Sequence, residues 1–188
     1  LERNGFAPHP AEKYKKFIGG GIGDLARRVL PDGVNDEERA ADLSVKMREE
    51  YSRRWSEKTR IYPGIEQMLD GIVKRGIRMA ILSNKPDDFT RIMCRHFLGS
   101  WHFSLILGAS DRLPKKPDPA AALVIARDMG IEPGNFIYLG DSDADMKTAV
   151  RAGMFPVGAL WGFRDADELT ANGAKLLLRN PEDILVLF

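Results

Sequence analysis

The sequence is poor in cysteine, in net charge and in long apolar runs. Its 188 residues contain one cysteine, Cys94, which excludes an intramolecular disulfide and a zinc site built from several cysteines. The 28 Lys and Arg residues nearly balance the 27 Asp and Glu residues, so no field of one sign is present to attract nucleic acid or an anionic membrane. No uncharged apolar run approaches the ~20 residues of a membrane-spanning helix. We therefore expect a soluble, cytoplasmic globular protein with no nucleic-acid partner and no membrane partner.

The chain divides into two regions that differ in their pattern of apolar and charged residues. Residues 1–58 have helical periodicity, many charged residues and almost no strand signal, which predicts a small helical domain. From residue 59 to residue 188, short apolar runs alternate with helical stretches of about ten residues. Strands are expected over 77–82, 103–107, 136–139 and 155–160. Helices are expected between them over 87–98, 120–129 and 145–152. This alternation predicts an α/β fold, with a parallel sheet covered by helices on both faces.

Polar side chains follow three of the expected strands. Ser83 and Asn84 follow the first, Lys116 lies beyond the second, and Asp141 and Asp145 follow the third. Ligands of such sheets bind at the carboxyl ends of the strands, so these side chains should meet. Together they suit a phosphoryl group. Ser83 and Asn84 would donate hydrogen bonds to phosphate oxygens, and Lys116 would supply positive charge. Asp141 would bind Mg²⁺, with Asp145 as a second ligand or an orienting group.

Each of these segments also has a plain structural explanation. A Ser-Asn pair after a strand is commonly a turn or a helix cap, and a lysine beside a proline is commonly a solvated loop residue. The acidic residues after Gly140 could simply cap a helix, because its N-terminus favours carboxylates. The occurrence of all three segments in order, each beyond a strand, favours a shared site.

The three segments resemble the second, third and fourth motifs of the haloacid dehalogenase-like hydrolases. They read SNKP at 83–86, KPDP at 116–119 and GDSDAD at 140–145, and they are most similar to those of the phosphoglycolate phosphatase-like branch. The resemblance implies a Rossmann-like three-layer core for residues 59–188 and a helical cap for residues 1–58. It also implies that Ser83 binds phosphate and that Lys116 stabilises an aspartyl-phosphate. Asp141 would ligate Mg²⁺ and Asp145 would support that metal site.

The first motif of this family, Asp-x-Asp-Gly-Thr, is absent from the sequence. Its first aspartate is the family's nucleophile and its second is the general acid and base, so we expect these residues alone to be inactive. Residues 1–6 resemble a helix end closed by Gly5, from which we expect about 20 to 30 further residues before Leu1. The missing strand would lie between the strand ending near Leu82 and the one ending near Gly140. Direct pairing of those two strands would contradict this expectation.

The resulting hypothesis is a Mg²⁺-dependent hydrolase of the phosphate monoester of a small metabolite. The resemblance makes 2-phosphoglycolate the first candidate, with pyrophosphate, sugar phosphates and nucleoside monophosphates as further candidates. The glycine-rich run at 19–23 follows no strand and is interpreted as a cap loop facing the substrate. A phosphosugar mutase and a noncatalytic relative that only binds phosphorylated metabolites are the alternatives. A dehalogenase, which would lack the Mg²⁺ requirement, is disfavoured by the acidic cluster at 140–145.

Overall fold

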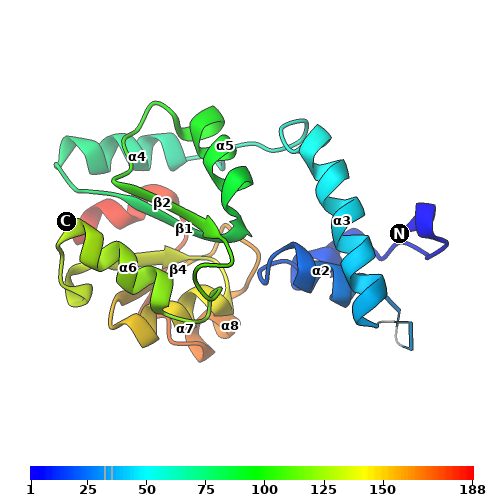
Figure 1. Cartoon of the computed structure of the whole chain (residues 1–188). Helices are drawn as coiled ribbons and strands as arrows, with labels where there is room; N and C mark the ends of the chain where they lie inside the picture. Colours follow the sequence, from blue (N-terminus) through cyan, green and yellow to red (C-terminus); the bar gives the residue numbers. More distant parts are fainter. Residues whose placement is uncertain (32, 35) are drawn as a thin grey trace.

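The computed structural model describes residues 1–31, 33–34 and 36–188. It consists of a helical unit and an α/β unit that lie side by side, joined by an extended linker (Figure 1). The helical unit contains η1 (Glu2–Asn4), α1 (Ala11–Phe17), α2 (Ile22–Val29) and α3 (Glu37–Arg54). The α/β unit contains α4 (Ile65–Lys74), β1 (Ala80–Pro86), α5 (Asp87–Leu98), β2 (Leu105–Ala109), α6 (Ala120–Met129), η2 (Pro133–Asn135), β3 (Ile137–Gly140), α7 (Asp143–Ala152), β4 (Phe155–Ala159), α8 (Ala166–Ala171), β5 (Leu176–Leu178) and η3 (Pro181–Leu187).

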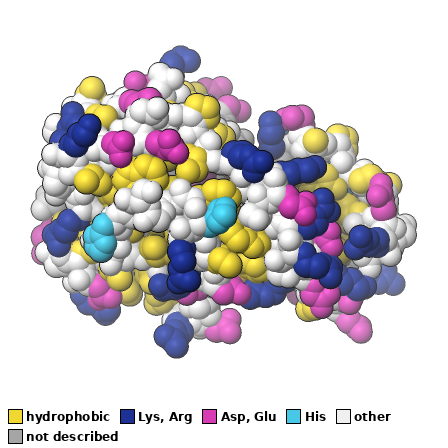
Figure 2. Space-filling view, turned by 90° about the horizontal axis from the view of Figure 1, so that it is seen from above, with side chains coloured by type: hydrophobic (Ala, Val, Ile, Leu, Met, Phe, Trp, Pro, Cys, Tyr) yellow, Lys and Arg dark blue, Asp and Glu magenta, His cyan; other side chains and the backbone are white. Residues whose placement is uncertain are grey.

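The helical unit has a small apolar cluster of its own. The Asp36 carboxylate accepts a hydrogen bond from the Arg39 amide at 2.7 Å and so caps the start of α3. The buried residues of the unit come from α2, its C-terminal end and α3: Ala26, Val29, Leu30, Ala40 and Leu43. Acidic and basic side chains are interspersed on its outer surface (Figure 2). Among the helices of the described residues, none combines the length and hydropathy needed to cross a bilayer.

The α/β unit confirms the predicted fold class. β1 pairs with β2, β3 pairs with β4 and β4 pairs with β5, all in parallel. In Figure 1, α4 and α5 lie above these strands, and α7 and α8 lie below them. One apolar cluster joins α4 and η3 to β4 and β5, and a second joins α6 and α7 to residues of β1 and β3. Helices therefore cover both faces, as in a three-layer Rossmann-like core.

The first predicted strand is displaced in the structure. The strand expected over 77–82 runs instead from Ala80 to Pro86, so it includes the polar residues that were expected to follow it. The Ile77 amide still donates to the Ile72 carbonyl at the end of α4, which keeps Ile77 outside the strand. The ladder with β2 shifts register between Leu82 and Pro86. Ser83 and Asn84 therefore lie on an irregular strand end rather than in a loop.

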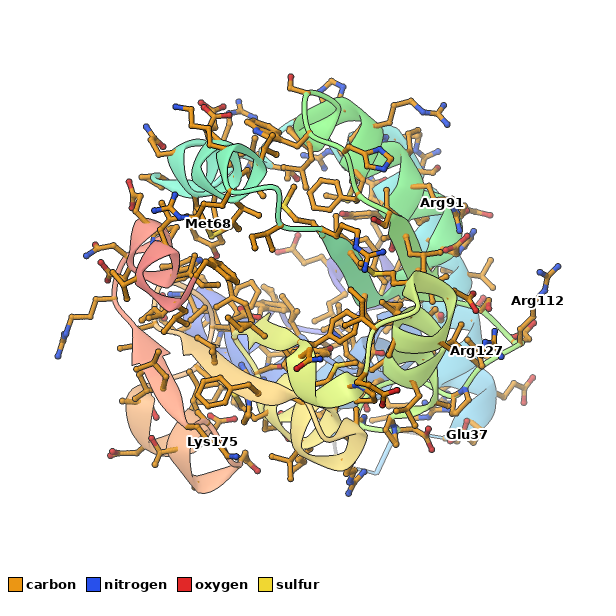
Figure 3. The ribbon with its side chains drawn as sticks, turned by 90° about the vertical axis from the view of Figure 1, so that its left-hand side faces the viewer. Glu37, Met68, Arg91, Arg112, Arg127 and Lys175 are labelled. Carbon is orange, nitrogen blue, oxygen red and sulfur yellow. The ribbon has the colours of Figure 1, made fainter. Side chains whose placement is uncertain are left out.

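The strands form two sheets rather than one. Within the described residues, β1 and β2 form a two-stranded sheet, β3, β4 and β5 form a three-stranded sheet, and β1 is not hydrogen-bonded to β3. A cavity of about 530 Å³ lies between them, lined by Leu82 of β1, Leu139 of β3 and Met68 of α4 among others. Figure 3 looks into this space, with Met68 at its edge. The direct pairing that would contradict a further strand here is not observed.

Candidate functional site

A second cavity lies where the helical unit faces the carboxyl ends of β1 and β3. Its volume is about 590 Å³, and all five site residues predicted from the sequence line it: Ser83, Asn84, Lys116, Asp141 and Asp145. Residues of the helical unit, including Ile18, Gly19, Gly21 and Tyr51, form the opposite wall. The structure therefore brings together in one pocket residues that lie far apart in the sequence.

Lys116 and Asp145 form a buried ion pair at the core side of the pocket. The Lys116 Nζ lies 2.7 Å from Asp145 Oδ1 and donates a second hydrogen bond to the Leu82 carbonyl at 3.2 Å. Their side chains are only 11% and 8% exposed, so little solvent screens the interaction. The ammonium is thus fixed at the end of β1, beside Ser83.

Asp145 also organises the start of α7. Its Oδ2 accepts hydrogen bonds from the Ser142 amide at 3.1 Å and the Ser142 hydroxyl at 2.6 Å, while the Asp145 amide donates back to Ser142 Oγ. This is a capping box, which satisfies amides at the helix N-terminus. Both carboxylate oxygens of Asp145 are therefore engaged within the protein. Burial, followed by the charge and hydrogen bond of Asp145, raises the pKa of the neighbouring Tyr138 hydroxyl.

Asp141 is held at the end of β3 by the loop that follows β4. Its Oδ2 accepts a hydrogen bond from the Phe163 amide at 3.0 Å. Residue 162 must be a glycine for this approach, because a Cβ there would lie 2.3 Å from the same oxygen. Burial and then repulsion from Asp145 raise the pKa of Asp141, against the opposing effects of Phe163 and Lys116. Holding this carboxylate ionised in the pocket therefore costs free energy.

A hard divalent cation fits this arrangement. It would offset the desolvation of the Asp141 carboxylate, and Mg²⁺ characteristically uses one or two protein carboxylates together with waters and substrate oxygens. Among the described residues, no group of three or more His, Cys, Asp or Glu side chains is placed to hold a metal ion. Asp141 is thus the available carboxylate here, and Asp145 is placed to orient its surroundings.

Ser83 and Asn84 differ in how their side chains are used. The Ser83 hydroxyl accepts a hydrogen bond from the Lys85 amide at 3.1 Å and keeps its own proton for a further partner. The buried Asn84 amide group donates to the carbonyls of Gly19 and Lys116, both at 3.0 Å, and accepts from the Lys116 amide at 2.8 Å. The donors of Asn84 are therefore occupied by backbone carbonyls, which differs from the expectation that they bind phosphate.

Three further residues at the pocket, Tyr51, Lys85 and Arg164, have no role predicted from the sequence. Lys85 donates a 2.7 Å hydrogen bond to the Tyr51 hydroxyl, which joins β1 to α3 across the pocket. Arg164 is buried in the loop after β4 and reaches carbonyl groups of the helical unit. Lys85 was visible beside Ser83 and Asn84 as part of the SNKP segment. Tyr51 and Arg164 had no local signal, because their partners lie far away in the sequence.

The fold and this pocket agree with the comparison to known families. The sequence profile of the haloacid dehalogenase-like hydrolases matches residues 1–159, and the chain belongs to this family. It is 31% identical over 186 residues to phosphoglycolate phosphatase 1 of Pseudomonas aeruginosa, covering 96% of this chain and 68% of that protein. It is 33% identical over 180 residues to the phosphoglycolate phosphatase of Neisseria meningitidis, covering 93% of this chain and 75% of that protein.

Solved structures show the same architecture. The crystal structure of a predicted phosphoglycolate phosphatase from Haemophilus somnus superposes with a TM-score of 0.88 at 21% identity, over 100% of this chain and 86% of that chain. At this level of identity the similarity establishes the fold alone. The family resemblance expected from the three strand-end motifs is thus confirmed by the sequence comparisons, and the structural comparison shows the same fold.

Proposed function

We propose that this protein is a phosphatase that hydrolyses the phosphate monoester of a small metabolite. The observation that carries the proposal is the convergence of Ser83, Lys116 and Asp141 on one pocket at the strand ends. A hydroxyl, an ammonium and a carboxylate suited to a cation are the groups that a transferring phosphoryl group needs. The similarity of this chain to phosphoglycolate phosphatases of Pseudomonas aeruginosa and Neisseria meningitidis supports the assignment.

Ser83 and Lys116 bind the phosphoryl oxygens in this proposal. The Ser83 hydroxyl donates one hydrogen bond, and the Lys116 ammonium neutralises charge on the phosphoryl group as its bond to the ester oxygen breaks. Asn84 has a different part, because its amide protons are already bound to carbonyl groups. It acts as a positioning residue that fixes the backbone of Lys116.

Asp141 would hold Mg²⁺, with the Asp145 carboxylate orienting Lys116 beside it. A bound Mg²⁺ would neutralise phosphoryl charge and align the phosphoryl group for in-line displacement. The Phe163 amide keeps the Asp141 carboxylate directed at the pocket. Asp141→Asn should therefore lower phosphate release by about a thousandfold, whereas Asp143→Asn, which removes the half-buried ion-pair partner of Lys147 within α7, should leave it within about threefold.

The nucleophile in this proposal comes from a further strand between β1 and β3. The two sheets leave an apolar cavity of about 530 Å³ there, and the family's first motif would place its aspartates at the end of such a strand, beside Lys116. The first carboxylate attacks phosphorus as the ester P–O bond breaks, and the second aspartic acid protonates the leaving alkoxide. Water then attacks the phosphorus of the acyl phosphate, which releases inorganic phosphate and restores the carboxylate.

The helical unit serves as a cap over the pocket. With the linker divided at residue 58, residues 1–58 form the cap and residues 59–188 the catalytic core. Closure of such a cap excludes bulk water and selects the leaving group. The separate apolar cluster of the helical unit supports this division.

Lys85 favours an acidic leaving group such as the glycolate of 2-phosphoglycolate. Its ammonium lies in the pocket and uses one proton on Tyr51, which leaves two donors for a substrate carboxylate. In Lys85→Met, KM for 2-phosphoglycolate should rise about tenfold, while KM for an ester whose leaving group carries no carboxylate, such as 4-nitrophenyl phosphate, changes less than about twofold. Equal increases for both substrates would contradict an anion-binding role for Lys85.

Phosphate release with and without EDTA tests the class of enzyme. We expect release from small phosphate monoesters by the protein that includes the proposed strand, loss of release in EDTA, and recovery with added Mg²⁺. Conversion of a sugar phosphate into its isomer with little phosphate release would identify a mutase instead. Binding of phosphate esters without turnover in that protein would identify a noncatalytic relative.

A further inference from the structure

The segment that connects α1 to α2 is fastened to the α/β unit through its backbone carbonyls. Arg164 Nη1 donates to the Lys15 carbonyl at 2.6 Å, and Nη2 donates to those of Lys16 at 3.4 Å and Ile18 at 3.0 Å. The Asn84 amide donates to the Gly19 carbonyl at 3.0 Å. Four carbonyls between residues 15 and 19 thus accept hydrogen bonds from Arg164 and Asn84, two side chains of the α/β unit.

Arg164 is built into this contact. The residue is 9% exposed, and its Nε pairs with Glu168 at 2.9 Å, so each of its side-chain nitrogens has a partner. Burial of a guanidinium is costly unless its donors are satisfied. The planar fork of arginine can serve several converging carbonyl oxygens at once, which a lysine ammonium cannot match. Arg164 therefore forms a specific, fully hydrogen-bonded contact between the two units.

The fastened segment covers the pocket. Ile18, Gly19 and Gly21 line the cavity that contains Ser83 and Asp141. Gly21 has φ +86°, and a Cβ at this position would lie 2.8 Å from the Asn84 carbonyl oxygen. The close approach of this segment to the strand end therefore depends on glycine, and the segment forms part of one wall of the cavity.

Both fastening residues are attached to the phosphate-binding end of the pocket. Arg164 follows Phe163, whose amide donates to Asp141 Oδ2. Asn84 accepts from the Lys116 amide at 2.8 Å while it donates to Gly19. Arg164 thus links the position of the segment to Asp141, and Asn84 links it to the backbone of Lys116.

We propose that Arg164 is a positioning residue that, with Asn84, holds the segment at residues 15–21 closed over the pocket and ties that closure to Asp141 and Lys116. The catalytic part of this inference rests on the proposed phosphatase function, but the structural part does not. Without Arg164 the segment would lift away from the strand ends, and the substrate would be held by the core alone.

Hydrogen–deuterium exchange tests the structural part without any substrate. In Arg164→Ala, amides over residues 18–22 should exchange roughly tenfold faster or more, because three hydrogen bonds from a buried cation are lost. Amides of α3 should keep their wild-type rates, which shows that the helical unit remains folded. Unchanged exchange over residues 18–22 would overturn the proposal, and so would equal acceleration throughout the helical unit.

Arg28→Ala is the matched control. Arg28 also donates to the Lys16 carbonyl, at 3.3 Å, but it belongs to α2 and is exposed, so it does not join the two units. Its loss should change exchange over residues 18–22 by less than twofold. Arg164→Lys, which keeps the charge but not the fork, should exchange nearly as fast as Arg164→Ala. Wild-type exchange in the lysine variant would show that charge alone suffices and would overturn the role of the fork.

Steady-state kinetics test the catalytic part. Arg164→Ala should raise KM about tenfold, with a smaller fall in kcat, whereas a merely structural defect would lower the active fraction and leave KM unchanged. An unchanged KM together with faster local exchange would restrict Arg164 to cap attachment and overturn the link to the pocket. If the wild-type protein released no phosphate, the phosphatase proposal would fail while the exchange result still stood.

Discussion

Two cavities among the described residues are similar in volume but differ in the charged side chains that line them. The one between β1 and β3 holds about 530 Å³ and is lined mainly by apolar side chains, whereas the one beneath the helical unit holds about 590 Å³ and contains Lys116, Asp141 and Asp145. Among the described residues, the edges of β1 and β3 that face the first cavity have no strand partner. This cavity therefore suits a further β-strand, which could pair with both edges. The second offers charges and hydrogen-bond donors, so what it can best receive is an anion. The cavity between β1 and β3 thus bears on the stability of the fold, whereas the cavity beneath the helical unit bears on ligand binding.

The largest expected effect concerns the apolar cavity. Extension of the chain at its N-terminus by a strand that pairs with both β1 and β3 should raise the free energy of unfolding by on the order of 5 kcal/mol, because it buries apolar area and satisfies two strand edges. Urea unfolding of the two proteins measures the difference. The same extension with a proline at its centre should recover less than half of the gain. An equal gain from both extensions would mean that the strand does not enter the sheet.

A smaller effect is expected at the ion pair of the polar cavity. Lys116→Met should lower the free energy of unfolding by about 3 kcal/mol, because it leaves the buried Asp145 carboxylate without its partner. The double variant Lys116→Met/Asp145→Asn should recover part of that loss, although Asp145→Asn also weakens the cap of α7. Denaturant titrations of the four proteins give the coupling free energy. Strict additivity of the two substitutions would contradict a stabilising pair.

The smallest effect is the pH dependence that Asp141 confers without a divalent cation. Because its pKa is raised in the folded protein, the native state binds the proton more tightly than the unfolded state. The ionised Asp141 therefore destabilises the folded protein, and this destabilisation is greatest at pH values above the pKa of Asp141 in the folded state. It decreases as the pH falls through that pKa toward the pKa of the unfolded state. Asp141→Asn should therefore melt at a higher temperature than wild type at pH 7, and the difference should shrink on acidification. A lower melting temperature for the variant at pH 7 would contradict the assigned shift.

Sequence patterns predicted the helices of the α/β unit better than its strands. The helices at 87–98 and 120–129 were predicted with the bounds that the structure shows, because proline precedes each and glycine follows each. The observed β1 begins and ends later than the strand predicted over 77–82. An apolar run indicates which residues are buried, but it does not indicate which residues pair with a neighbouring strand. β5 was not predicted, since three leucines between charged segments carry no periodicity that distinguishes a strand.

The residues of the candidate site also differ in how well the sequence predicts them. The meeting of Ser83, Lys116 and Asp141 could be predicted because Ser83 and Asp141 lie at strand ends and Lys116 lies in the segment that follows β2. The roles of Tyr51 and Arg164 could not be found, because they depend on how the helical unit packs on the α/β unit. The Arg164 contacts join residues 146 to 149 positions apart, a separation at which a single sequence contains no readable signal.

The two uses of Asp145 constrain how this protein can be engineered. One carboxylate closes the capping box of α7 with one oxygen and holds Lys116 with the other. Replacing that salt bridge with apolar side chains to gain stability would remove the ammonium that the proposed function assigns to phosphoryl binding, and it would also weaken the N-terminal cap of α7. Directed evolution for heat tolerance should accordingly fix its substitutions elsewhere, and libraries that randomise position 145 should return aspartate under selection for turnover.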